Sequence, residues 1–180
     1  MVTTRSRGFT LTELMVTLAV AAVLIAIAAP SYRDFILDTG MSAEANEFLT
    51  TVNFARSEAV KRNVRVTMCR SSDGAGCANA GNWAQGWIVF TDLDGAALGT
   101  YNAGTDEILR VHAALTTQST LTGTTNVATY ISFIPDGRSQ LADNATAQTG
   151  DIDLCNSGSS VKDRRLHLQL GRAQVTQIDC

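Results

Sequence analysis

The 180-residue sequence is poor in lysine, histidine and proline, and these shortages limit the functions open to it. Only two of its fourteen basic residues are lysines, Lys61 and Lys162, and its net charge is −3. This balance argues against nucleic-acid binding over the whole surface, although the arginines permit small patches with planar, bidentate contacts. No long linker rich in glycine and proline is present, which argues against a second independent domain. We therefore expect one globular head beside an N-terminal helix.

The sequence also lacks the residue patterns of common catalytic and metal sites. It has no Gly-x-Ser-x-Gly motif, no phosphate-binding glycine loop with a lysine, and no nucleophile paired with a base. His112 and His167 lack metal-ligand spacing, and Asp92 and Asp94 begin a calcium-loop pattern whose later ligands are missing. We expect no enzyme, no cofactor and no metal site, with two structural histidines and a turn at residues 92–95.

The cysteines contain no Cys-x-x-Cys pair of the kind that favours zinc or thioredoxin-like chemistry. An even number of them favours disulfides over buried thiols, and three connectivities are open. Their spacing favours one bridge that closes a short loop and another that fixes the C-terminal tail. Because disulfides persist in oxidising compartments, we expect the chain after residue 62 to lie outside the cytoplasm. The favoured pairs are Cys69 with Cys77 and Cys155 with Cys180.

One long apolar run is present near the start of the chain. Residues 9–29 contain seventeen apolar and four polar residues. As a helix they extend roughly 31 Å, enough to cross a hydrocarbon core of about 30 Å. Arg5 and Arg7 precede the run and the next basic residue is Arg33, so the positive-inside tendency places the N-terminus in the cytoplasm. The alternative is an ordinary secretory signal peptide cleaved near residues 26–28.

An acidic residue within this run, Glu13, favours the first interpretation. A carboxylate at the centre of a membrane helix costs on the order of 2.5–3.5 kcal/mol, and such residues are functional by default. Residues 8–14, GFTLTEL, resemble the leader of type IV prepilins and type II secretion pseudopilins. The resemblance implies that prepilin peptidase cleaves between Gly8 and Phe9 and that Phe9 is N-methylated. It also implies that Glu13 is an assembly carboxylate, which pairs with the Phe9 amine of a neighbouring subunit.

After the apolar run, the hydrophobic pattern changes from helical to alternating. Pro30 is expected to bend or locally open the helix, and Gly40 and Ser42 to mark the joint and cap of an amphipathic helix over residues 42–62. The Ser/Thr-rich segment 116–126 is expected to be a strand edge or loop. Short alternating segments predict strands near residues 64–69, 87–90, 108–111, 130–134, 152–154 and 166–170.

These patterns together predict an α+β fold. A long N-terminal pilin helix, transmembrane in its first half and amphipathic in its second, packs on an antiparallel β-sheet head. The expected organisation is a cleaved leader over residues 1–8, the helix over 9–62 with its transmembrane part at 9–29, and the head over 63–180.

Further motifs resemble one group among the pilin-like proteins. Residues 55–62 (ARSEAVKR), 66–69 (VTMC) and 86–90 (GWIVF) are similar to the GspH/FimT group of minor pilins and pseudopilins. The resemblance implies a minor subunit at or near a filament tip, anchored in the bacterial inner membrane before assembly. Its implied partners are prepilin peptidase and other major and minor pilins or pseudopilins. These motifs are compatible with a subunit of a type IV pilus and with a subunit of a type II secretion system.

The C-terminal part adds DNA uptake as another function. FimT-type subunits bind DNA through a Gly-Arg-x-Arg motif, and the corresponding residues 171–174 are Gly-Arg-Ala-Gln, so the second arginine is missing. Losing one phosphate contact weakens binding and flattens its salt dependence. The alternative is a solvated strand end without DNA contact. The candidate DNA-binding residues are Lys162, Arg164, Arg165 and Arg172.

Overall fold

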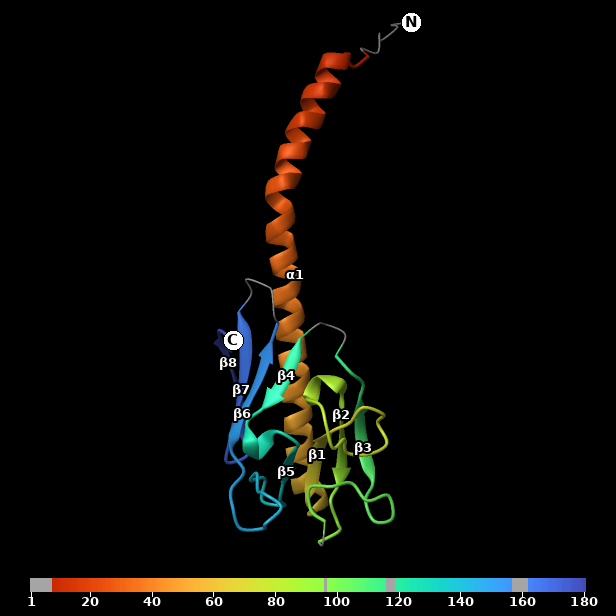
Figure 1. Cartoon of the computed structure of the whole chain (residues 1–180), viewed down its shortest axis with the longest axis vertical. Coiled ribbons are helices and arrows are strands. Elements are labelled where there is room, and N and C mark those ends of the chain that lie inside the picture. The colour runs from red at the N-terminus through yellow and green to blue at the C-terminus, as the bar shows by residue number, and fades with distance from the viewer. Residues whose placement is uncertain (1–7, 96, 116–118, 157–161) are drawn as a thin grey trace, which may run out of the picture.

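A single long helix projects from a β-rich head in the computed structural model of this chain (Figure 1). The structure describes residues 8–95, 97–115, 119–156 and 162–180, so residues 1–7 of the expected leader lie outside it. The helix, α1 (Leu11–Arg62), is the one helix in these ranges that is long and apolar enough to cross a membrane, by length and composition. Its first half extends away from the head, and its second half lies within it.

The helix is continuous, which corrects the prediction of a joint near Gly40 and of a second helix capped by Ser42. It begins after the N-cap residue Thr10 and ends at Asn63, whose φ of 54° is left-handed. Pro30 removes one backbone N–H donor, but the residues on both sides of it remain helical. Figure 1 shows a gentle curve without a break. The apolar half of α1 and the half that packs in the head are therefore one uninterrupted helix.

The head contains two four-stranded antiparallel sheets. Their strand orders are β3-β2-β1-β5 and β4-β6-β7-β8, and both sheets pack on α1. The predicted α+β class is confirmed. The strands are β1 (Val66–Arg70), β2 (Trp87–Thr91), β3 (Ile108–His112), β4 (Thr120–Gly123), β5 (Tyr130–Phe133), β6 (Gly150–Cys155), β7 (Asp163–Gln169) and β8 (Arg172–Ile178), with short 3₁₀ helices η1 (Trp83–Gln85) and η2 (Thr125–Val127).

All the predicted strand segments are present, with ends shifted by a few residues. The described part of the Ser/Thr-rich segment supplies β4, while residues 116–118 lie outside the description. Strand β8 is not predicted from the sequence, because the alternation of Ala173 and Val175 with polar residues is short, the polar pair Thr176 and Gln177 breaks it, and alanine is uncommon in strands.

The hydrophobic core lies between the second half of α1 and the two sheets. Phe48 is fully buried and meets Trp83 and Trp87 edge to face, with ring centroids 5.3 and 5.1 Å away. Such aromatic pairs contribute about 0.5–1.5 kcal/mol each beyond their burial. Five buried apolar positions of the helix follow the predicted amphipathic stripe, namely Ala45, Phe48, Val52, Ala55 and Ala59, and Met41 is buried one turn before them.

Two disulfides close the head. Cys69 is bonded to Cys77, which ties β1 to the loop that follows it, and Cys155 is bonded to Cys180, which ties β6 to the end of the chain. These are the pairs that the spacing favours. In the chain-entropy model each bridge stabilises the head by roughly 2–4 kcal/mol.

Candidate functional site

The start of α1 is a reciprocal capping box between Thr10 and Glu13. Thr10 Oγ1 accepts a hydrogen bond from the Glu13 amide at 3.3 Å, and Glu13 Oε2 accepts one from the Thr10 amide at 3.4 Å. The box satisfies two of the backbone N–H donors that the start of a helix leaves open. Thr10 is absent from the sequence-based candidates, although the Thr-x-x-Glu spacing is the signature of a capping box.

The apolar half of α1 presents a large exposed apolar surface. Phe9 and Leu11 are about three quarters exposed, at 76% and 74%, and the apolar side chains that follow are also exposed. The hydroxyl of Thr17 donates to the Leu14 carbonyl at 2.9 Å, so its hydrogen bond is made within the helix. An apolar surface this long marks contact with lipid or with other apolar helices.

Comparison with protein families bears on both halves of the chain. A model described as the prokaryotic N-terminal methylation motif matches residues 3–29, and one described as type II transport protein GspH matches residues 44–171. The chain belongs to the GspH family. No curated protein sequence gives a significant match.

Two solved structures share the fold of this GspH-family chain. Both are crystal structures of the type IV minor pilin FimU from Pseudomonas aeruginosa. One is 19% identical, with a TM-score of 0.57, and the match covers 79% of this chain and 92% of that one. The other is 20% identical, with a TM-score of 0.53 and coverage of 75% and 91%.

The structure places the predicted DNA-binding residues on different surfaces of the GspH-family head. Arg164 is only 5% exposed, which corrects the expectation that it faces a ligand. Its Nη2 donates to Asp38 Oδ1 at 2.6 Å and to Ser42 Oγ at 3.0 Å, and its Nη1 donates to the Lys162 carbonyl at 2.6 Å. Arg164 therefore holds β7 against α1.

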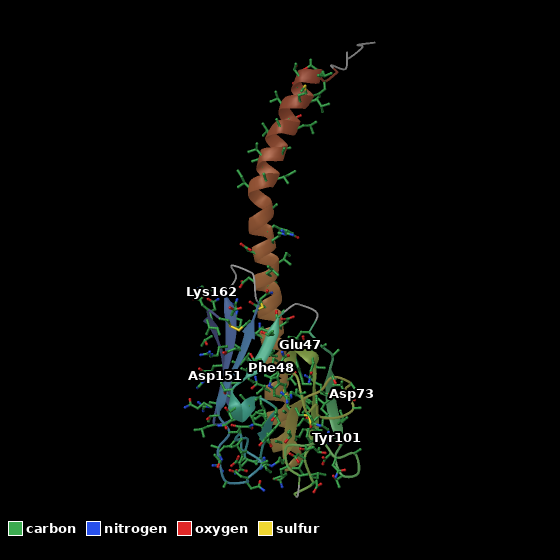
Figure 2. The ribbon with its side chains drawn as sticks, viewed as in Figure 1. Glu47, Phe48, Asp73, Tyr101, Asp151 and Lys162 are labelled. Atoms are coloured by element: carbon green, nitrogen blue, oxygen red, sulfur yellow. A yellow bond between two sulfur atoms is a disulfide. The ribbon has the colours of Figure 1, made fainter. Side chains whose placement is uncertain are left out.

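Arg165 lies on the other face of β7, within an ion-paired surface. It makes a bidentate contact with Asp153, with Nε–Oδ1 and Nη2–Oδ2 distances of 2.6 and 2.8 Å. The hydrogen bonds that Arg165 donates to this carboxylate raise the pKa of its guanidinium. Lys162 pairs with Asp179 near the upper end of the same sheet, while Asp151 lies lower on it (Figure 2). The acidic partners offset the positive charge, so these residues form no basic face.

Gly171 and Arg172 lie at the tight turn between β7 and β8. Leu170 and Gly171 have left-handed φ values of 49° and 82°, as two-residue hairpin turns require. A Cβ on Gly171 would lie 2.2 Å from the Gly137 carbonyl oxygen, so the glycine is required for packing. Arg172 is exposed beside this contact.

Two further arginines lie near the same glycine contact. Arg56 of α1 donates from Nε to the Gly137 carbonyl at 2.9 Å, and Arg138 follows Gly137 and pairs with Asp136. We call Arg56, Arg138 and Arg172 the distal arginine cluster, because they lie toward the end of the head away from the apolar half of α1. No local sequence signal indicates this cluster, since its members come from α1, a loop and β8.

The remaining sequence candidates have structural contacts. His112 stacks on Trp87 with a 3.9 Å centroid separation, and its Nε2 lies 2.9 Å from Glu47 Oε1. Asp92 is buried, and its Oδ2 accepts hydrogen bonds from the Thr67 hydroxyl at 2.6 Å and the Gly99 amide at 2.9 Å. Burial raises the pKa of Asp92. Its carboxylate thus fixes the loop after β2, where the calcium-like pattern occurs.

Proposed function

We propose that this GspH-family chain is a minor pilin of a type IV pilus, a structural subunit that acts in filament priming or at the tip. The observation that carries the proposal is the continuity of α1, which joins an exposed apolar half bearing the methylation motif directly to the head. The fold shared with the minor pilin FimU supports a pilus as the filament.

In this proposal prepilin peptidase cleaves between Gly8 and Phe9, and Phe9 is then N-methylated. Residues 9–29 anchor the subunit in the bacterial inner membrane, with a cytoplasmic N-terminus and a periplasmic head at 63–180. The exposed apolar side chains of this segment support a lipid or filament-core environment. Other pilins then replace lipid around α1 during assembly, with Glu13 as the assembly carboxylate.

The test is complementation of a deletion strain with Glu13→Ala and, as the matched control, Thr12→Ala. We expect Glu13→Ala to lower the number of pili about tenfold or more at equal protein level, because a filament contact to a charge in lipid is lost. Thr12→Ala is expected to restore pili. Pilus number and pilus-dependent motility that are unchanged by both Glu13→Ala and the deletion would refute the proposal.

DNA binding is a second candidate, which the distal arginine cluster favours. Arg56 donates to the Gly137 carbonyl against which Gly171 packs, and Arg172 is exposed at the adjoining turn, so these two arginines come from distant segments to one end of the head, beside Arg138 and its partner Asp136. The full chain in detergent micelles is titrated with labelled duplex DNA at several salt concentrations. If the cluster binds DNA, Arg172→Ala weakens binding and lowers the salt slope by about 1, while Arg165→Ala does neither. Absence of salt-sensitive binding in the wild type excludes this candidate.

A type II secretion pseudopilin is a third candidate, which the description of the matching GspH model favours. It differs from a minor pilin in its partners rather than in its chemistry. Deletion of the gene distinguishes the two, because a pseudopilin is required for secretion of exoproteins and a minor pilin for surface pili. The neighbouring genes give the same distinction.

A further inference from the structure

An exposed apolar stripe lies on α1 between the apolar run and the head, where the helix leaves the head (Figure 1). Tyr32, Phe35 and Ile36 are 66%, 65% and 50% exposed, although they follow the 9–29 segment. Their i, i+3, i+4 spacing places them on one face of the helix. Thr39 continues this face, and its hydroxyl donates to the Phe35 carbonyl at 2.8 Å, so its hydrogen bond is made within the helix. We call Tyr32, Phe35 and Ile36 the proximal stripe.

The proximal stripe faces away from the head. Met41, which is buried in the head, follows Tyr32 by nine residues, or two and a half turns at 3.6 residues per turn. The two side chains therefore point in opposite directions. The side of α1 toward the head is polar at this height, since Asp38 pairs with Arg164 of β7 at 2.6 Å. The head thus leaves the proximal stripe uncovered.

The position of the proximal stripe along α1 matches the headgroup layer of a bilayer. This step rests on the proposed function, in which residues 9–29 span the hydrocarbon core. Tyr32 and Ile36 lie three and seven residues beyond this segment, or about 5 and 11 Å along the helix axis. The headgroup layer extends about 5–8 Å beyond the core on each side. Tyrosine is enriched there, because its ring is apolar and its hydroxyl is wet, and Arg33 beside it can reach lipid phosphates.

The two faces of α1 differ in apolar length, which favours lipid as the partner of the stripe. On the face of the stripe, apolar side chains continue from residue 9 to Ile36, roughly 42 Å at 1.5 Å per residue. On the face toward the head they end near residue 29, after roughly 31 Å, because Asp38 follows. A hydrocarbon core of about 30 Å accommodates the longer face when the helix tilts toward that side.

We propose that the proximal stripe lies in the lipid headgroup layer on the periplasmic side of the membrane and tilts α1 of the unassembled subunit toward that side. The head then lies on the upper side of the tilted helix, away from the lipid. The surface of the head that meets other subunits is thereby kept clear of the membrane. The stripe sets the orientation of the subunit, whereas residues 9–29 anchor it.

Tryptophan fluorescence of the full chain in phosphatidylethanolamine–phosphatidylglycerol vesicles tests this placement. Trp83 and Trp87 are fully buried in the head, so they give a background that quenchers in lipid or water do not reach. One reporter is introduced by Phe35→Trp. Its matched control is Asp34→Trp, which lies one residue earlier on the side of the head and is also exposed. The quenchers are a nitroxide on the lipid headgroup, bromines at the ends of the acyl chains, and iodide in water on both sides of the vesicle.

We expect the headgroup nitroxide to quench the Phe35→Trp reporter about threefold more than the Asp34→Trp reporter, and iodide to quench it about threefold less. A Val20→Trp reporter in the middle of the apolar run should be quenched mainly by the acyl-chain bromines. The pattern for Phe35→Trp should not change when the ratio of lipid to protein is raised about tenfold, because lipid rather than a second chain covers the stripe.

Three results would overturn the inference. Equal quenching of the Asp34→Trp and Phe35→Trp reporters would show that α1 does not tilt toward the stripe. Quenching of Phe35→Trp mainly by the acyl-chain bromines would place the stripe in the hydrocarbon core. A Phe35→Trp reporter that iodide reaches only after dilution with lipid would assign the stripe to a second chain. A Val20→Trp reporter that the acyl-chain bromines do not quench would refute the membrane anchor itself, and with it the proposed function.

Discussion

At the scale of single residues, Asp92 shows how burial makes a carboxylate sensitive to pH. Its pKa is raised mainly by desolvation, against hydrogen bonds from Thr67 and Gly99 and the charge of Arg65. A raised folded pKa favours the protonated form in the folded state. The stability from this group is therefore present below the unfolded pKa of about 3.9 and is lost as the pH rises through the folded value.

The Asp92→Asn variant tests this pH dependence. Asparagine has no charge to desolvate, so the unfolding free energy of the variant should increase relative to that of the wild type as the pH rises from about 4 to 7. Urea unfolding of the full chain in detergent, followed by tryptophan fluorescence, measures the difference at each pH. A difference that stays constant across this range would contradict the buried, pH-sensitive carboxylate.

The two neighbouring arginines Arg164 and Arg165 should differ in their effect on stability. Arg164 is buried against Asp38 and Ser42, so Arg164→Ala should cost about 1–3 kcal/mol of unfolding free energy. Arg165 lies in a partly exposed surface pair, so Arg165→Ala should cost less than about 1 kcal/mol. Denaturant titration compares the two variants. Equal losses of unfolding free energy in the two variants would contradict the conclusion that burial makes Arg164 the more stabilising of the two arginines.

At the scale of elements, the β7–β8 hairpin depends on its turn glycine. Gly171→Ala introduces a Cβ at 2.2 Å from the Gly137 carbonyl oxygen and a side chain at a φ of 82°. We expect a loss of about 1–3 kcal/mol in unfolding free energy. Gly76→Ala is the control, because a Cβ there meets nothing within 4 Å. Thermal unfolding of both variants measures the effect, and equal midpoints would refute the packing role.

The edge strand β8 should promote association of the head. It pairs only with β7 among the described strands, and residues 173–178 carry no charge and no proline. By contrast, the Gln148 side chain covers the edge of β5 by accepting from the Ser132 amide and donating to the Tyr130 carbonyl. Thr176→Lys should therefore lower aggregation of the purified chain, measured by light scattering, whereas Gln169→Lys, at an exposed position of the central strand β7, should have less effect. Equal scattering from both would contradict this.

The elements differ in how far the sequence predicts them. The apolar run and the amphipathic stripe predict α1 because each has a strong helical period. Pro30 predicts a bend or a local opening and Gly40 predicts a joint, but α1 is one continuous helix that curves gently. A proline removes only one backbone N–H, and packing on both sheets stabilises the second half of the helix. The distal arginine cluster could not be predicted, because its members come from segments far apart in the sequence and local periodicity does not indicate which segments meet in the fold.

At the scale of the whole molecule, one continuous helix links the segment that matches the methylation motif to the head. The proposed roles of Glu13 and of the Gly8–Phe9 bond are predictions from the sequence alone, because their motif is local and places a charge in an apolar run. The capping box of Thr10 and Glu13 is also readable from the sequence, through its Thr-x-x-Glu spacing, whereas the different roles of Arg164 and Arg165 depend on burial, which only the fold reveals. The proposed function requires that α1 stays attached to the head after cleavage of the leader.

The mass of the mature N-terminal peptide tests that requirement most directly. The protein is purified from membranes of its host and its N-terminal peptide is analysed by tandem mass spectrometry. We predict a chain that begins with N-methylated Phe9 and retains the whole apolar run of α1. A chain that begins after residues 26–28, or one that retains Met1, would contradict the account.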